Sequence, residues 1–203
     1  MKKVSELSTS IKSIRELQAL LPSLIYIICI PIFIECRSLT NIDVSNFDTS
    51  QVIDMSFMFY GCSSLTELNV SDFDTSQVTN MIDMFGSCSN LTNLNLSNFN
   101  TSQVTSMAGM FEMCLSIENI DVSQFNTSQV TDMSFMFSGC SALKELNVSQ
   151  FNTSRVTNMM LMFDNCAKLT NLNLCNFNTS QVTSMAGMFE MCMSIENIDV
   201  SNF

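Results

Sequence analysis

Hydrophobic residues recur along this chain at a fixed interval of 26 residues. Three series keep that interval without an insertion: Phe47, Phe73, Phe99, Phe125, Phe151, Phe177 and Phe203; Cys36, Cys62, Cys88, Cys114, Cys140, Cys166 and Cys192; and Phe59, Phe85, Phe111, Phe137, Phe163 and Phe189. A fixed period between about 20 and 50 residues is typical of solenoids and repeat arrays. The pattern therefore predicts a stack of equivalent coils that bury one continuous core between neighbours.

The pattern within residues 90–115 predicts the course of one coil. Leu91, Leu94 and Leu96 form an L-x-x-L-x-L signature, and the last two alternate with polar residues as in a β-strand. Phe99 then turns inward at the corner, and residues 100–102 have the composition of a turn. This signature and the 26-residue period predict a leucine-rich-repeat-like solenoid.

The second half of the coil is predicted to contain a short strand and a helical turn. Residues 103–107 alternate as a strand would, with Val104 and Met107 inward. The next inward positions follow at spacings of three, one and three residues: Met107, Met110, Phe111 and Cys114. This spacing favours one or two turns of α- or 3₁₀-helix. The predicted coil is strand, turn, short strand and helical turn.

The turn position of each coil holds either aspartate or asparagine. It is Asp48 and Asp74 in two copies and asparagine in the next four, Asn100, Asn126, Asn152 and Asn178. The two residue types share a carbonyl acceptor but differ in charge. The position is therefore predicted to accept a backbone hydrogen bond and not to hold calcium.

Cysteine and methionine are predicted to fill the core. Stacked coils place equivalent Cβ atoms about 4.7–4.9 Å apart, beyond the roughly 3.8 Å that a disulfide prefers, so we expect free thiols. No histidine and no C-x-x-C motif are present, which argues against a zinc site. The two methionine series could also offer thioethers to Cu(I), but their inward spacing favours core packing. We therefore predict no metal and no cofactor.

The outward strand positions form the candidate interaction face. They make two rows of acidic and amide side chains, continued by Asn197 and Asp199, and the predicted residues are Asn41, Asp43, Glu67, Asn69, Asn93, Asn95, Asn119, Asp121, Glu145, Asn147, Asn171 and Asn173. A merely solvated surface is the alternative. Residues 38–203 carry 3 basic and 16 acidic side chains, a net charge of −13, which disfavours nucleic acid as a partner.

No pattern of catalytic residues is present. General acid–base catalysis usually uses histidine, and this chain has none. No G-x-G-x-x-G, P-loop or nucleophile elbow occurs. The chain is therefore predicted not to be an enzyme.

The chain is predicted to divide into three parts. Residues 1–22 are predicted to form an amphipathic capping helix, 23–37 a degenerate first half-coil, and 38–203 six repeats and a partial seventh. A signal or membrane segment within residues 17–34, with Lys2 and Lys3 as a positive flank, is the alternative. The C-terminal strand edge is predicted to be uncovered, which favours end-to-end self-association.

The segment from Asp48 to Phe73, and each later copy, follows the pattern D/N-T-S-x-V-T-x-M-x-x-M-F-x-x-C-x-x-L-x-x-L-x-V/L-S-x-F. The departures are Ile53 at the second threonine, isoleucine at both leucine positions in the copies 100–125 and 178–203, and Cys175 at the serine. Over residues 32–203 this resembles the BspA-like leucine-rich-repeat surface proteins, and more narrowly the repeat of unknown function common in Mycoplasma lipoproteins. The resemblance implies a cell-surface or secreted protein that binds a host or extracellular-matrix protein. It supplies no catalytic residues and no ligand site.

The chain departs from this family where a lipid anchor is expected, because Ile27 and Ile28 precede Cys29 in place of a small residue. A cytoplasmic location therefore stays open. The alternative function is an intracellular or self-assembling structural scaffold, including the product of a truncated repeat gene.

Overall fold

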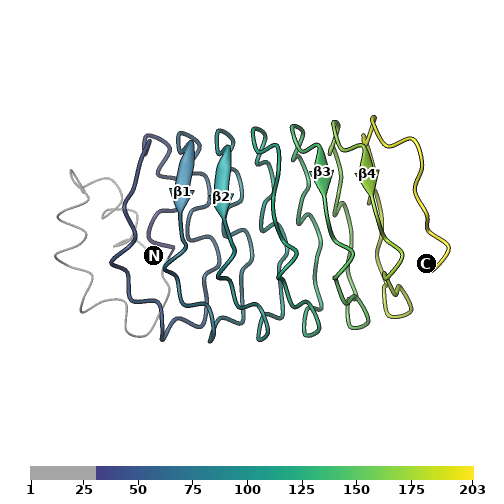
Figure 1. Ribbon diagram of the computed structural model, residues 1–203, viewed down its shortest axis with the longest axis horizontal. Helices are drawn as coiled ribbons and strands as arrows, with labels where there is room; N and C mark the ends of the chain where they lie inside the picture. Colours follow the sequence, from purple (N-terminus) through teal and green to yellow (C-terminus); the bar gives the residue numbers. More distant parts are fainter. Residues whose placement is uncertain (1–30) are drawn as a thin grey trace.

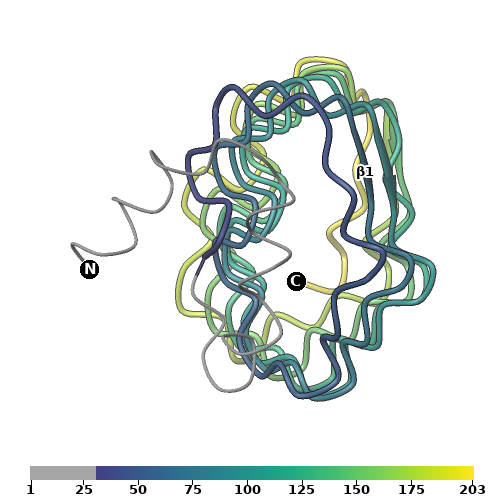
Figure 2. The same ribbon diagram turned by 90° about the vertical axis from the view of Figure 1, so that its left-hand side faces the viewer.

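The computed structural model describes residues 31–203, which form a stack of coils along one axis (Figure 1). Seen down that axis, successive coils superimpose as closed loops around a common interior (Figure 2). The predicted helix over residues 1–22, residues 23–30 of the predicted half-coil, and most of the alternative signal segment lie outside the described residues.

Short parallel strands mark one side of the stack. They are β1 (Glu67–Asn69), β2 (Asn93–Asn95), β3 (Glu145–Leu146) and β4 (Asn171–Leu172). β1 pairs with β2 and β3 with β4, and Glu67 lies opposite Asn93 and Glu145 opposite Asn171. Every pair joins residues 26 positions apart, so the sequence period is the register of the sheet. This is the parallel stacking that the repeat predicted.

The predicted second strand at residues 103–107 is wrong in extent. Only one residue of each coil forms a bridge there, and these residues make a single file of parallel bridges: Asp54, Asn80, Ser106, Asp132, Asn158 and Ser184. The neighbouring Val104 is buried, as the alternation predicted. The alternation identified the inward residues correctly but not the length of the strand.

The predicted helical turn is also wrong, because residues 31–203 contain no helix. In its place, every second N–H of the segment bonds to the next coil. Met107, Gly109 and Phe111 donate to carbonyls of the following coil at 3.0, 2.8 and 3.0 Å. The intervening N–H groups close tight turns within their own coil, as Met110 does to the carbonyl of Met107 at 3.2 Å. We call this arrangement the turn ladder.

Left-handed residues make the turn ladder possible. Each complete coil has two of them, and in one coil these are Gly109 at φ 62° and Met113 at φ 57°. A residue with positive φ in the third position of a tight turn redirects the chain before a helix can continue. The three-one-three spacing is therefore satisfied by consecutive turns that point the same side chains inward.

Two left-handed positions hold glycine in some coils and larger residues in others. One row has Gly61 and Gly139 where another coil has Ser87 at φ 59°. A non-glycine residue in this conformation costs roughly 1–2 kcal/mol. Substitution by glycine removes this cost, but part of the stability gained is lost again because glycine raises the entropy of the unfolded chain.

Ser87→Gly is expected to raise the free energy of unfolding by about 0.5–1 kcal/mol, because glycine removes the left-handed strain. Ser89→Gly, two residues away at an ordinary φ, should lower it by about 0.5–1 kcal/mol. Urea unfolding with an unchanged m-value measures both. Changes of the same sign in the two variants would contradict the proposed strain.

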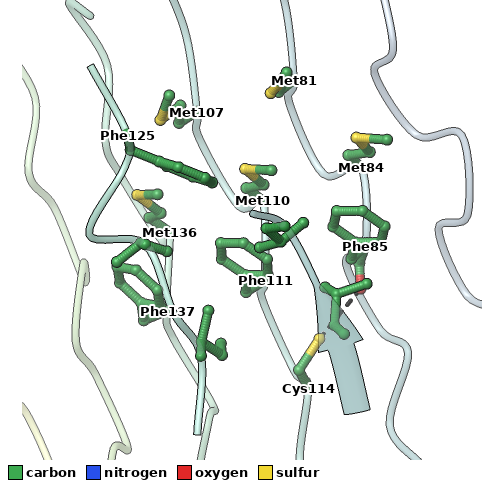
Figure 3. Packing of buried hydrophobic residues seen from close by; sticks show 14 of the residues in the cluster. Met81, Met84, Phe85, Met107, Met110, Phe111, Cys114, Phe125, Met136 and Phe137 are labelled. Atoms are coloured by element: carbon green, nitrogen blue, oxygen red, sulfur yellow. Dashed lines mark hydrogen bonds between the residues drawn. The ribbon is translucent and has the colours of Figure 1, made fainter. Parts of the chain in front are cut away.

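The core consists of columns of identical side chains (Figure 3). Phenylalanine rings of successive coils lie nearly parallel, and Phe111 stacks on Phe85 and Phe137 at centroid distances of 5.8 and 5.5 Å. Met107 and Met110, from the two methionine series, are fully buried beside it. The prediction that the repeated methionine, cysteine and phenylalanine series form the core is confirmed for the described coils that have a neighbour on both sides.

Candidate functional site

The strands place the predicted interaction face on one side of the stack. All twelve predicted residues are exposed, while the residues between them, such as Leu68 and Leu94, are buried. The register aligns them in two rows that run along the solenoid. We name them the first row (Asn41, Glu67, Asn93, Asn119, Glu145, Asn171 and Asn197) and the second row (Asp43, Asn69, Asn95, Asp121, Asn147, Asn173 and Asp199).

The second row has a structural task at the end of each strand. Asn95 Oδ1 accepts the N–H of Ser97 at 3.1 Å, and Asn69 Oδ1 accepts that of Ser71 at the same distance. Such Asx turns fix the chain reversal that follows the strand. The same bond recurs in every member of the second row. The Oδ1 atoms of these residues already accept a backbone hydrogen bond and are therefore less available to a partner.

The side chains of the first row accept no such backbone hydrogen bond. Glu67, Asn93 and Glu145 form no side-chain hydrogen bond with another described residue, and Asn171 bonds only to its neighbour Thr170 at 3.3 Å. Their carboxylates and carboxamides point outward from β1 to β4 and are available to a ligand. The structure thus divides a face that the sequence treated as uniform.

The carboxylates of the second row keep their charge in acid. Hydrogen bonds from the hydroxyl and then the N–H of Ser45 lower the pKa of Asp43, and Ser123 does the same for Asp121. Asp199 has the same arrangement with Ser201. The face therefore stays negative well below neutral pH.

One ion pair crosses the coils beside the first row. Lys144 Nζ lies 2.6 Å from a carboxylate oxygen of Glu118, and both side chains are exposed. This contact lowers the pKa of Glu118, through the hydrogen bond first and the charge second. An exposed pair of this kind contributes little to stability. It neutralises the charge of Glu118, whereas Glu67 and Glu145 have no ion-pair partner among the described residues.

The turn position behaves as predicted. Asp48 Oδ1 accepts the N–H of Ser50 at 3.1 Å, and Asn100 Oδ1 accepts that of Ser102 at 3.1 Å. The bond is the same whether the side chain is charged or neutral. The prediction of a backbone acceptor is confirmed.

A column of buried threonines beside this turn was not predicted. The hydroxyl of Thr101 donates to the carbonyl of Asn126 at 3.1 Å and accepts the N–H of the same residue at 2.7 Å. Thr49, Thr75, Thr127 and Thr153 repeat both bonds with the next coil. Each hydroxyl therefore joins two coils where no strand ladder does.

The cysteines also join coils, as free thiols. All eight cysteines within residues 31–203 are free, which confirms the prediction for that part of the chain. The thiol of Cys114 donates to the carbonyl of Phe85 at 3.3 Å (Figure 3). Burial raises the pKa of Cys114 to about 12, so this thiol is a weak nucleophile at neutral pH. Cys175 is the exposed exception, at the corner after β4.

No group of three or more histidine, cysteine, aspartate or glutamate side chains that could hold a metal ion occurs among residues 31–203. Within the same residues there is no apolar helix of the length that crosses a membrane. Core positions of the last coil of this sequence are exposed, among them Met185 and Phe203. A neighbouring coil covers the same positions elsewhere, and self-association through this edge stays a prediction.

The repeat region matches a known protein family. The model of a family described as "Mycoplasma protein of unknown function, DUF285" matches residues 29–145 and 113–203. No curated protein matches the chain.

Two solved structures are similar to the chain. The crystal structure of the T. pallidum leucine-rich repeat protein TpLRR has a TM-score of 0.47 and 22% identity, over 74% of this chain and 64% of that one. A functional domain of InlJ from Listeria monocytogenes, which includes a cysteine ladder, has a TM-score of 0.20 and 17% identity, over 80% of this chain and 49% of that one. The chain spans less than two thirds of either protein.

Proposed function

The chain belongs to the family described as Mycoplasma protein of unknown function, DUF285, and on that basis we propose that it is a non-enzymatic repeat protein that binds another protein through its strand face. The proposed site is the first row, with Glu67, Asn93, Glu145 and Asn171 at its centre. We further propose that the protein acts at the cell surface or after secretion, as an adhesion-type molecule.

The observation that carries this proposal is the contrast between the two rows. Side chains of the second row accept backbone hydrogen bonds, and so do those at the turn position. The first row is exposed and lacks such bonds apart from the one between Asn171 and Thr170. A solenoid has no single pocket, and extended binding surfaces of this kind are how repeat proteins engage their ligands.

Charge indicates the kind of partner. Residues 38–203 have 16 acidic and only 3 basic side chains. Such a surface repels phosphate backbones and attracts basic protein segments. The proposed partner is therefore a protein with a basic surface, such as a host or extracellular-matrix protein.

The proposed location is tested on intact cells that express the protein. Protease treatment of intact cells should remove the protein from the cell fraction, or the protein should be found in the medium. A cytosolic protein assayed in the same samples is the control for lysis. Protection of the repeat protein until the cells are lysed would overturn the surface proposal.

Binding is tested with the purified protein and a panel of extracellular-matrix proteins that includes both basic and acidic members. We expect at least one basic member to bind, with an affinity that falls as the salt concentration rises, because exposed charges are screened within about 8 Å at physiological ionic strength. Binding that does not depend on salt, or no binding at all, would contradict the proposal.

A further inference from the structure

One carboxyl group of the turn ladder lies in a row that otherwise carries no charge. The row of left-handed residues on this side of the stack contains Phe57, Asp83, Gly109, Phe135, Leu161 and Gly187. Asp83 is the one member that titrates. Its backbone is held like that of its counterparts, since its N–H donates to the carbonyl of Ala108 in the next coil at 2.9 Å.

The Asp83 carboxyl is packed between two glycines. A Cβ atom placed on Gly109 of the next coil would lie only 2.2 Å from Asp83 Oδ1, and one on Gly86 would lie 2.9 Å away. The carboxyl thus occupies the space that side chains would fill at both positions. Oδ1 is buried and has no hydrogen-bond partner within the described residues. An unpaired buried carboxylate oxygen is costly, and a protonated carboxyl in the same place costs much less.

The nearest charged group is another acid. Glu112 of the next coil faces Asp83, and repulsion between the two carboxylates favours a proton on the pair. From the preceding coil, the ring of Tyr60 packs against Gly86. Among residues 31–203 no basic side chain compensates the pair. Arg37 bonds to Glu35, Lys144 to Glu118 and Arg155 to Gln129, while the charge of Lys168 acts on Glu118.

We propose that the joint between the coil of Asp83 and the coil of Glu112 is controlled by protons: protonation of the Asp83 carboxyl closes the joint, and loss of that proton loosens it. The proposal goes beyond the proposed binding function and does not depend on it. It makes one joint of the solenoid sensitive to pH, while the other joints have apolar residues or glycine at the same position.

The direction of the pH effect follows from the two states of Asp83. Burial, and then Glu112, raises the pKa of Asp83 in the folded protein to about 6, and burial raises that of Glu112. In the unfolded chain Asp83 titrates near its ordinary value of 3.8. The folded protein therefore binds more protons between these values, so stability falls as the pH rises through this window and stays lower above it.

Hydrogen exchange at single amides tests the joint. The N–H of Phe85 bonds to the carbonyl of Met110 across it, at 3.0 Å. Corrected for the intrinsic pH dependence of exchange, the protection of this amide should fall roughly tenfold between pH 5 and 7.5, since one pKa unit corresponds to a factor of ten. The N–H of Phe137, which bonds to Met162 at 2.9 Å in a later joint, is the internal control and should not change.

Two substitutions make the test decisive. Asp83→Asn keeps the shape, removes the titration of Asp83 and should remove most of the pH dependence at Phe85, leaving only the contribution of Glu112. Asp83→Gly, the residue of two other coils in this row, should do the same if the asparagine variant does not fold. Equal pH dependence at Phe85 and Phe137, or an undiminished pH dependence at Phe85 in the Asp83 variants, would overturn the proposal.

Discussion

Phe111→Ala is expected to lower the free energy of unfolding by about 3–5 kcal/mol, the cost of removing a fully buried aromatic ring from a packed core. The ring stacks on Phe85 and Phe137, so the substitution interrupts the phenylalanine column in the middle of the stack. Because each coil contacts only its neighbours, we expect the two sides of the break to unfold less cooperatively. Urea unfolding followed by circular dichroism measures both effects.

Phe135→Ala is the matched control for this prediction. Phe135 lies in the next coil, but its side chain is only partly buried and its φ is 57°. The left-handed strain remains with alanine, and little core volume is lost. We expect a loss of about 1 kcal/mol, on the scale of the lost apolar area. If Phe111→Ala were as mild as Phe135→Ala, the phenylalanine column would not be the main stabilising element of the coils.

Thr101→Val is expected to lower the free energy of unfolding by about 2–3 kcal/mol, although valine has nearly the same shape. The Thr101 hydroxyl bonds to both the N–H and the carbonyl of Asn126, at 2.7 and 3.1 Å, and a valine at this buried position leaves both of these partly buried groups without their partner. Thermal or urea unfolding measures the loss.

Thr105→Val tests the same chemical change in the same coil. The hydroxyl of Thr105 also bonds to a neighbouring coil, to the carbonyl of Thr79 at 3.1 Å, but this side chain is exposed. Water replaces the lost hydrogen bond, so we expect a change below about 0.5 kcal/mol. Equal losses in the two valine variants would mean that the buried threonines do not tie the coils together.

The fold could be predicted from the sequence because the same residue type returns at the same position of each coil. Phe111 and Cys114 were placed in the core by their 26-residue series alone. The exchange of Asp74 for Asn100 between copies was as informative, because it removed the charge and kept the acceptor. Comparison between copies separated what the backbone needs from what the surface tolerates.

The turn ladder could not be predicted from the spacing of its apolar residues. Consecutive tight turns and a helix both place Met107, Met110 and Phe111 on one side. The signal that separates them is the glycine at position 109, repeated at 187, because a glycine in the middle of a short helix is unfavourable. The hydrogen bonds to the next coil made the turns more favourable than a helix.

The candidate face could be located from the sequence but not resolved into its two rows. Alternation placed Asn93 and Asn95 outward, and both are exposed. Only the folded structure shows that Asn95 Oδ1 accepts the N–H of Ser97, while Asn93 has no such bond. The proximity of Asp83 and Glu112 could not be predicted either. The two residues are 29 positions apart in the sequence, and only the stacking of the coils brings them together.

The proposed binding through the first row is tested most directly by reversing its chemistry. We would measure the affinity of the basic extracellular-matrix protein found to bind, using Glu67→Lys/Glu145→Lys in the first row. The control is Gln77→Lys/Gln103→Lys, which adds lysines at exposed glutamines away from the strands. We expect the first-row variant to bind at least about tenfold more weakly, from loss of attraction and added repulsion, and the control to bind like the unaltered protein. Equal affinities for the two variants would contradict binding through the first row.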